Sequence, residues 1–316
     1  MTYLVRFVLL TLAMLTASGG AQAPLDSPYS PVPEIAQGPQ IPEAGYRVET
    51  IGRDLYVVND GFYLAMFMVY DEGVVVVNAP QSLGANLLAA IRSVTEKPVT
   101  HFIYTHAEAD HVGAAALFEG ATYIAQEEAA ARLERASDPA RPVPSLTFAD
   151  NYTLTVGDQT LELRYWGNSH APGSIFVYAP EQKALMVVNI VLPGWAPFVY
   201  LNSAEDVPGF IEAHEQILSY DFDTFVGGHW NRVGTREDVE LAQAYVLDLR
   251  ADALEAVKNV TFGDVAARVG FSNPVALVKA YNEAQIDACA QRNLSKWLGR
   301  LGGVDVAIRE NCHTMI

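Results

Sequence analysis

The order of strand-like and helix-like segments is the feature that most constrains what this chain can fold into. Four short segments rich in β-branched and aromatic residues follow one another closely, at residues 46–51, 55–59, 62–70 and 74–78. Such composition is typical of strands. Segments with helical periodicity then alternate with further strand-like runs up to residue 257. A run of strands followed by helix–strand alternation predicts an α/β fold with two sheets flanked by helices.

The sequence changes character near residue 261, where helical patterns continue and strand-like runs stop. We expect a main domain at residues 46–260 and a small helical cap at residues 261–316, with helices at 262–269 and 274–292. Both cysteines, Cys289 and Cys312, lie in this cap. In an oxidising compartment they are expected to form a disulfide. The alternative is a role as metal ligands, although no histidine pattern surrounds Cys289.

The first residues are typical of a secretory signal peptide. Arg6 precedes an apolar stretch at residues 7–16, and Ala21-Gln22-Ala23 forms a small-x-small cleavage site. The apolar stretch is too short for a membrane span, which needs about 20 residues. We therefore expect removal of residues 1–23 and a periplasmic or secreted protein without membrane attachment. Residues 24–45 are rich in proline and predict an arm or linker.

Charge narrows the range of partners. Against 37 acidic residues the chain has 20 lysines and arginines, which gives a formal net charge of −17. This excess repels nucleic acid and anionic membranes, and no basic cluster offsets it. The expected partner is a small-molecule substrate, and the oligomeric state is left open.

Residues 105–113 carry the strongest chemical signal and read Thr-His-Ala-Glu-Ala-Asp-His-Val-Gly. They directly follow a predicted buried strand at residues 99–104. Imidazole and carboxylate groups are the usual ligands of zinc and of non-haem iron or manganese. The alternative is a charged loop, but the intervening alanines leave no bulk between the candidate ligands. Those ligands are His106, Glu108, Asp110 and His111.

Further polar residues lie at or just past the ends of predicted strands, namely Asn78, His170, Asn189 and His229. Strand-end loops gathered on one edge are where sheet scaffolds build sites. A lone histidine is more often structural, but His170 and His229 each lie near glycine, and together with the first motif they favour metal binding. The remaining histidines are expected to be structural: His101, His214 and His313.

Taken in order, these residues resemble the metallo-β-lactamase fold superfamily. Its hallmark is His-x-His-x-Asp-His, then a single histidine, a bridging aspartate and a final histidine. The resemblance runs from about residue 46 to residue 230 and implies an αβ/βα four-layer sandwich with a small C-terminal helical extension. It also implies one or two divalent metal ions, with zinc expected and iron as the alternative. By position, one metal would be held by His106, Glu108 and His170, and the second by Asp110, His111 and His229.

The sequence departs from the family pattern at three positions. Glu108 replaces a histidine, Asn189 replaces the bridging aspartate, and Asn78 replaces an aspartate common at the end of that early strand. The usual ligand set carries a charge of about −2, and Glu108 with Asp110 gives the same charge, so glutamate restores what Asn189 removes. We expect Asn189 and Asn78 either to bridge the metals weakly or to support the ligands from behind.

The resemblance implies a metal-dependent hydrolase, and the predicted signal peptide implies that it is exported. Metal-bound hydroxide would attack a small ester, lactone, thioester or β-lactam-like amide, with Asp110 as the catalytic residue that orients it. The form His-x-Glu-x-Asp-His also resembles the flavodiiron proteins, whose pattern keeps the bridging aspartate and adds a flavodoxin domain. Two alternatives therefore stay open: a di-iron oxygen or redox protein with a flavodiiron-like site, and a non-catalytic binding protein with a weakened metal site.

Aromatic residues near the candidate ligands are expected to form an apolar mouth. An apolar rim with few basic residues suits a neutral cyclic ester or amide better than a polyphosphate. Core packing is the alternative for each of these side chains. The candidates are Phe62, Tyr63, Trp195, Phe198 and Tyr200.

Overall fold

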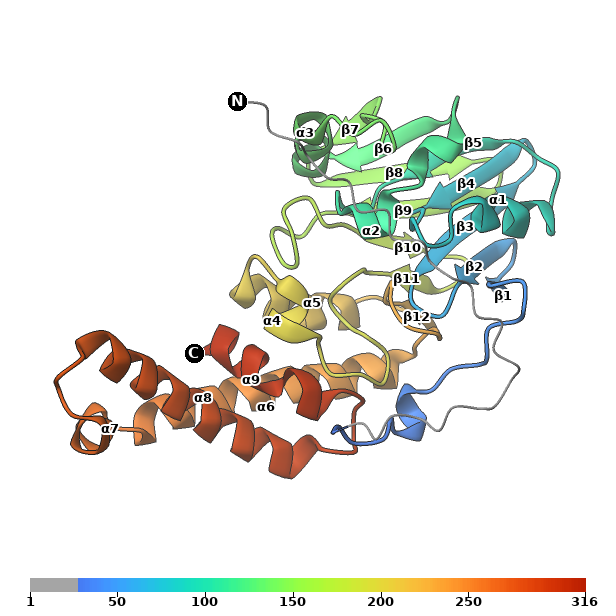
Figure 1. Cartoon of the computed structure of the whole chain (residues 1–316). Coiled ribbons are helices and arrows are strands. Elements are labelled where there is room, and N and C mark those ends of the chain that lie inside the picture. Colours follow the sequence, from blue (N-terminus) through green and yellow to red (C-terminus); the bar gives the residue numbers. More distant parts are fainter. Residues whose placement is uncertain (1–27) are drawn as a thin grey trace, which may run out of the picture.

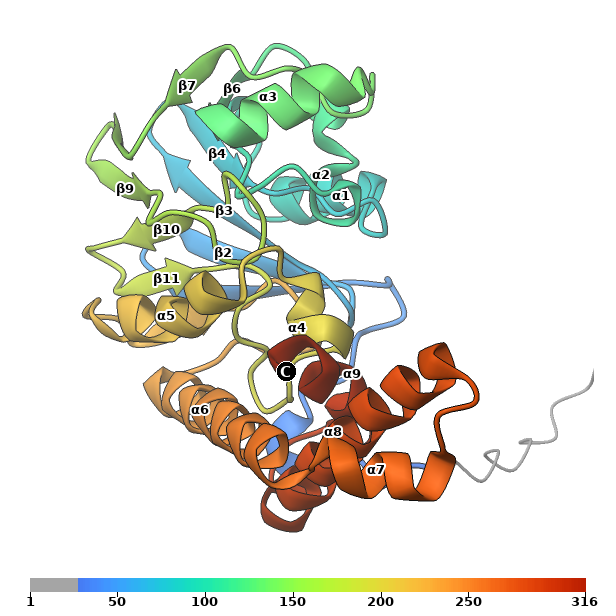
Figure 2. The same cartoon turned by 90° about the vertical axis from the view of Figure 1, so that its left-hand side faces the viewer.

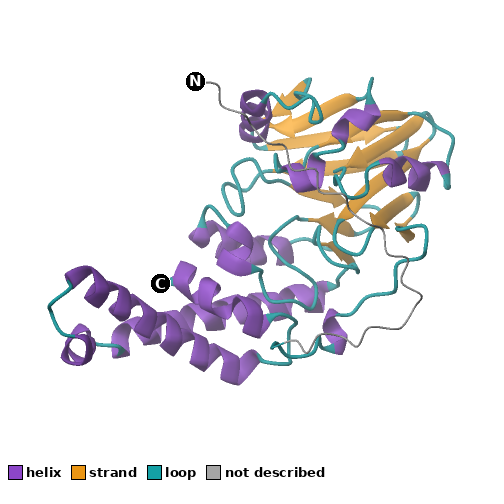
Figure 3. Cartoon of the chain, in the orientation of Figure 1, coloured by secondary structure: helices purple, strands orange, loops and turns teal. Residues whose placement is uncertain are grey.

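Residues 28–316 are described by the structure, a computed structural model, and within that range two β-sheets pack face to face (Figure 1). The predicted signal peptide, residues 1–23, lies outside the described residues. No helix in the described range is both long and apolar enough to span a bilayer. Strands occupy one half of the molecule and long helices the other (Figure 3).

The first sheet has seven strands in sequence order. They are β1 (Arg47–Gly52), β2 (Leu55–Asn59), β3 (Leu64–Tyr70), β4 (Gly73–Val77), β5 (Val99–Ile103), β6 (Thr122–Gln126) and β7 (Leu146–Phe148). The strands from β1 to β4 are antiparallel, and those from β4 to β7 are parallel. The early run of strands is thus a meander, and the later alternation of helix and strand builds the parallel part, as crossover connections require.

The second sheet has five strands in the order β12-β11-β10-β9-β8. They are β8 (Asn151–Val156), β9 (Gln159–Arg164), β10 (Phe176–Ala179), β11 (Ala184–Met186) and β12 (Thr224–Val226). Strands β9, β11 and β12 run in the same direction, because β10 is antiparallel to both β9 and β11, and β12 is parallel to β11. Their carboxyl ends therefore share one edge.

Helices cover the outer face of each sheet (Figure 2). On the first sheet these are α1 (Ala85–Arg92), α3 (Glu127–Ala136) and the turn η2 (Ala115–Phe118). On the second they are α5 (Val207–Leu218) and α6 (Arg236–Asn259). A third apolar cluster fills the space between the sheets. Three apolar layers between four layers of structure confirm the predicted αβ/βα four-layer sandwich.

The segment between β5 and β6 forms two short helical pieces. α2 (Ala109–Val112) is a single turn within the candidate metal motif, and η2 follows it. Gly113 ends α2, and a β-carbon there would lie 2.4 Å from the carbonyl oxygen of Ala109. Glycine is therefore required for this close backbone approach at the end of α2.

The cap consists of α7 (Phe262–Val269), α8 (Pro274–Trp297) and α9 (Val304–Met315). The predicted disulfide between Cys289 and Cys312 joins α8 to α9. Helix α8 extends past the predicted end at residue 292, because buried Asn293 and Trp297 continue its inward face. Both cysteines belong to the apolar cluster that also covers the second sheet, so the larger part of the cap shares a core with the main domain.

The described part of the proline-rich arm lies along the surface beside the cap. Its one short turn, η1 (Glu34–Ala36), buries Ala36. The indole Nε1 of Trp195 donates to the carbonyl of Ala36, and the guanidinium of Arg232 donates to the carbonyl of Ile35.

His214 of α5 gives the fold a pH dependence that can be measured. It is buried, its Nδ1 lies 3.0 Å from the carbonyl oxygen of Phe210, and burial lowers its pKa to about 4. Above pH 6.5 the imidazole is neutral in both states. Below that pH the unfolded chain takes up a proton that the folded chain refuses, so stability falls as the pH falls towards 4.

We expect wild-type protein to lose about 2 kcal/mol of unfolding free energy from this group between pH 7 and pH 5. His214→Leu should abolish this pH-dependent loss of unfolding free energy, as measured by urea unfolding at both pH values. The control is His313→Gln, at an exposed position. An unchanged pH dependence in His214→Leu would show that this histidine does not carry the effect.

Candidate metal centre

Two groups of side chains converge where the strands of both sheets end. His106 and Glu108 follow β5, and His170 follows β9; their ligand atoms all lie within 4.8 Å of one another. Asp110 and His111 lie on α2, and His229 follows β12, forming a second such group. The grouping is the one that the resemblance implied by position.

Glu108 is the centre of the first group. Its Oε2 lies 2.8 Å from Nε2 of His170 and 3.2 Å from Nε2 of His106. In the second group, Nε2 of His111 lies 3.0 Å from Nε2 of His229 and 3.6 Å from the Asp110 carboxylate.

These separations fit metal ligation. Two ligands bound tetrahedrally at 2.0–2.1 Å from zinc lie about 3.3 Å apart, and the observed distances fall on either side of that value. Two imidazole nitrogens that face each other, as in His111 and His229, compete for one proton unless a cation lies between them. Buried histidines and two carboxylates also form the donor set that divalent zinc or iron prefers.

Protonation states favour cation binding. Burial disfavours the ionised form of Glu108, but hydrogen bonds from His106 and His170 outweigh it and hold the pKa of the carboxyl well below its usual range. Burial lowers the pKa of His111 well below the ordinary histidine value and also lowers the pKa of His229. Carboxylates that are ionised and imidazoles that are neutral are the forms that bind metals.

Asn78 supports the site without facing it. Its Oδ1 accepts from the backbone N–H and the hydroxyl of Thr105, both at 3.1 Å, and the Thr105 hydroxyl lies 2.8 Å from Nδ1 of His106. The chain of contacts orients the imidazole so that Nε2 faces Glu108. Sequence reasoning missed Thr105, although its place directly before His106 is a usable signal, since metal-binding histidines commonly have the second ring nitrogen held by a polar partner.

Asn189 lies where the family has a bridging aspartate. Its Nδ2 lies 3.1 Å from Oε2 of Glu108 and 3.0 Å from Nε2 of His170. Its buried Oδ1 has no partner among the described residues. Rotating the amide by half a turn would direct this oxygen at the ligands, so Asn189 offers a cation one neutral oxygen. A φ of +66° suits asparagine, which adopts the left-handed region more readily than most residues.

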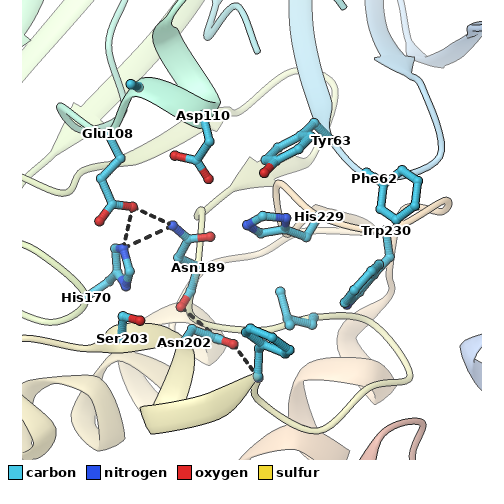
Figure 4. Close-up of a pocket in the computed structure, with 13 residues that line it drawn as sticks. Phe62, Tyr63, Glu108, Asp110, His170, Asn189, Asn202, Ser203, His229 and Trp230 are labelled. Carbon is cyan, nitrogen blue, oxygen red and sulfur yellow. Dashed lines mark hydrogen bonds and ion pairs between the residues drawn. The ribbon is translucent and has the colours of Figure 1, made fainter. Parts of the chain in front are cut away.

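A cavity of about 560 Å³ opens over both groups (Figure 4). Three of the five predicted mouth residues line it, namely Phe62, Tyr63 and Phe198. Trp195 and Tyr200 do not. Trp195 stacks behind Trp230 with ring centroids 4.8 Å apart, and Tyr200 is half exposed on a turn beside the cavity.

The cavity also has lining residues that sequence reasoning did not select. Trp230 directly follows His229, and its place next to a candidate ligand is a signal that the sequence offers. Asn202 and Ser203 lie on a turn whose unusual backbone no periodicity reveals. The lining residues are Phe62, Tyr63, Glu108, Ala109, Asp110, His170, Asn189, Leu192, Phe198, Asn202, Ser203, His229 and Trp230.

Tyr63 places a hydroxyl beside the second group. Its ring lies 5.2 Å from that of His111 and 4.9 Å from that of His229, between centroids. Burial and the neighbouring Asp110 carboxylate raise the pKa of the Tyr63 phenol, so it remains a hydrogen-bond donor at neutral pH. Figure 4 shows the hydroxyl on the side of Asp110.

Known proteins share this fold and part of the sequence. Residues 58–187 match the sequence model of the metallo-beta-lactamase superfamily. The 2,4-dinitroanisole O-demethylase subunit alpha of Nocardioides sp. (strain JS1661) is 28% identical over 238 residues, which cover 71% of this chain and 70% of that protein. A metallo-beta-lactamase from Pontibacter korlensis matches in structure with a TM-score of 0.56 and 21% identity, over 64% of this chain and 99% of its own. The DIM-1 metallo-beta-lactamase matches with a TM-score of 0.55 and 17% identity, over 66% of this chain and 99% of its own.

Proposed function

We propose that this chain is a member of the metallo-β-lactamase superfamily and an exported hydrolase that uses divalent metal ions, with zinc expected, to cleave a small uncharged substrate. The observation that carries the proposal is the pair of three-residue groups facing one cavity.

In this proposal the residues of the site have different chemical roles. Cations held by the two groups would supply Lewis acidity and lower the pKa of a bound water to about 7. The Asp110 carboxylate is about half exposed at the cavity, with 45% of its side chain accessible, so it can orient an attacking water and accept its proton. Tyr63 donates towards the same space and can hold Asp110 or a developing oxyanion.

The cavity wall points to the substrate class. Aromatic rings of Phe62, Phe198 and Trp230 line it, and no lysine or arginine among residues 28–316 does. Such a wall favours a small ester, lactone, thioester or β-lactam-like amide over a polyphosphate.

A second candidate reaction follows from the demethylase relative. Its name states an aryl methyl ether as substrate. Attack of hydroxide on an electron-poor aryl ether breaks one carbon–oxygen bond and yields a phenolate and methanol, with no oxidant required. The aromatic wall of this cavity suits a flat ring, so this chemistry belongs beside ester and amide hydrolysis.

A substrate panel tests these proposals. Zinc-loaded and chelator-treated protein would be offered 4-nitrophenyl acetate, a lactone, a thioester, a β-lactam and 2,4-dinitroanisole. We expect metal-dependent turnover of at least one of the first four, or release of dinitrophenol from the last. Loss of turnover on chelation and its return with zinc support the proposal, and no turnover of any compound in either state contradicts it.

Asn189→Asp tests the meaning of the missing bridge. The added carboxylate restores the family ligand, and with Glu108 present it brings the site charge to about −3. We expect tighter retention of the second metal, by roughly tenfold in competition with a chelator, together with a changed kcat. The control is Asn151→Asp, at an exposed position outside the cavity and both ligand groups. If metal content and turnover both stay unchanged, this account of Asn189 is wrong.

Export is proposed from the first 23 residues alone. Fractionation of cells that express the full chain would place the protein outside the cytoplasm, with a mature N-terminus at Pro24. Retention in the cytoplasm with residues 1–23 intact would contradict it.

A further inference from the structure

One turn beside the cavity has a backbone that L-residues rarely adopt. In α4 (Val199–Ser203), φ is +58°, +54°, +57° and +60° at the four consecutive residues 200–203. Left-handed helical dihedrals cost an L-residue about 1–2 kcal/mol each. Such a segment persists only where its surroundings impose it, and strain of this kind collects at functional sites.

The C-terminal cap imposes this conformation. Leu201 is fully buried, and its backbone N–H donates to Oδ1 of Asn311 at 2.8 Å. The other end of the same amide, Nδ2 of Asn311, donates to the carbonyl of Pro197 at 2.8 Å. Asn311 lies on α9 with no solvent exposure, directly before the disulfide-bonded Cys312. One amide therefore fixes both the approach to the turn and its centre.

Turn 200–203 also contacts the candidate metal centre (Figure 4). Nδ2 of Asn202 donates to the carbonyl of Asn189 at 3.0 Å, and Oδ1 of Asn202 accepts from the N–H of Phe198 at 2.6 Å. Phe198, Asn202 and Ser203 line the cavity. Since the side chain of Asn189 touches Glu108, a continuous chain of contacts links the cap to a candidate ligand.

A second contact from the cap supports the same wall. Gly302, just before α9, packs on the Trp195 ring so closely that a β-carbon would lie 2.7 Å from it. Trp195 stacks on Trp230, which lines the cavity. The cap therefore backs the wall at two separate points.

We propose that Asn311 is a positioning residue for the substrate cavity. From the cap, it holds turn 200–203 in its left-handed form, and through Asn202 it fixes the wall beside Asn189. The kinetic consequence rests on the proposed hydrolase function, whereas the structural consequence does not. On this proposal the helical cap helps to shape the substrate cavity, although no cap residue lines it.

Hydrogen exchange on the metal-loaded full-length protein provides the first test. Asn311→Ala should raise exchange of the Leu201 and Asn202 amides at least tenfold. The matched control is Asn293→Ala, which removes another fully buried asparagine of the cap, one whose amide contacts Asp252 and not the turn. Equal exchange of these amides in both variants would overturn the proposal, whatever the enzyme does.

Kinetics provide the second test. Once a substrate is in hand, Asn311→Ala should raise KM about tenfold while kcat and metal content change less than threefold, and Asn293→Ala should leave KM unchanged. Asn202→Ala cuts the next contact in the chain and serves if Asn311→Ala fails to fold. Combined, the two changes should raise KM no more than Asn202→Ala alone. The proposed chain of contacts would be contradicted if the double variant multiplied the two separate increases in KM. It would also be contradicted if Asn202→Ala had the KM of wild type.

Discussion

Glu108→Ala is expected to remove one of two metals per chain and to lower kcat/KM at least a thousandfold, equivalent to about 4 kcal/mol. The reason is geometric, because Oε2 of Glu108 lies within 3.2 Å of both histidines of its group. Without it two imidazoles remain, and a cation held by two neutral ligands dissociates easily. Metal content by mass spectrometry and kcat/KM on the best panel substrate are the measurements.

The control for this change is Glu119→Ala, at an exposed position outside both ligand groups. It should keep both metals and full activity. Retention of two metals by Glu108→Ala would show that this carboxylate is not a ligand.

Charge compensation between Glu108 and Asn189 has a sharper test. The double change Glu108→His with Asn189→Asp restores the usual family ligands and keeps the charge of the set near −2. If Glu108 compensates for the missing bridge, Asn189→Asp should increase metal content more in the Glu108→His background than in wild type. The metal content of the double variant should then exceed the value expected from adding the two separate effects. Simple additivity would mean that the two positions act independently.

Asp110→Asn is expected to lower kcat by roughly a hundredfold to a thousandfold, with KM little changed. The amide keeps the shape of the side chain but removes the charge and the ability to accept a proton. Because the carboxylate is half exposed at the cavity, substitution there should not unfold α2. Steady-state kinetics across pH 5–9 would measure the effect.

The comparison for that variant is Asp150→Asn, at an exposed position far along the chain in the loop before β8. It should match wild type. A normal kcat in Asp110→Asn would exclude this carboxylate from the reaction and leave it a structural partner of His111.

The fold was predictable because its main determinants are local. The valine run of β4 and the apolar segment before His106 each indicate a buried strand. Parallel strands place their carboxyl ends on one edge of a sheet. That rule places His170 and His229, which follow β9 and β12, on one edge of the second sheet. The packing of the two sheets face to face then brings them against the motif that follows β5 in the first sheet.

The cavity wall was only partly predictable, because its shape depends on contacts between distant segments. Trp195 was expected at the mouth, yet it lies behind Trp230, held by Ala36 of the arm and Gly302 of the cap. The left-handed turn that carries Asn202 exists because α9 supplies Asn311, and no periodicity near residue 200 indicates it.

Metal content measured together with hydrolysis tests the central claim most directly. Protein purified from its native compartment should contain two zinc ions per chain, lose turnover when a chelator removes them, and recover it with zinc. Iron with visible absorption and no hydrolysis would support a di-iron redox protein instead. Less than half a metal per chain, with no turnover after zinc is added, would contradict the account and leave a binding protein.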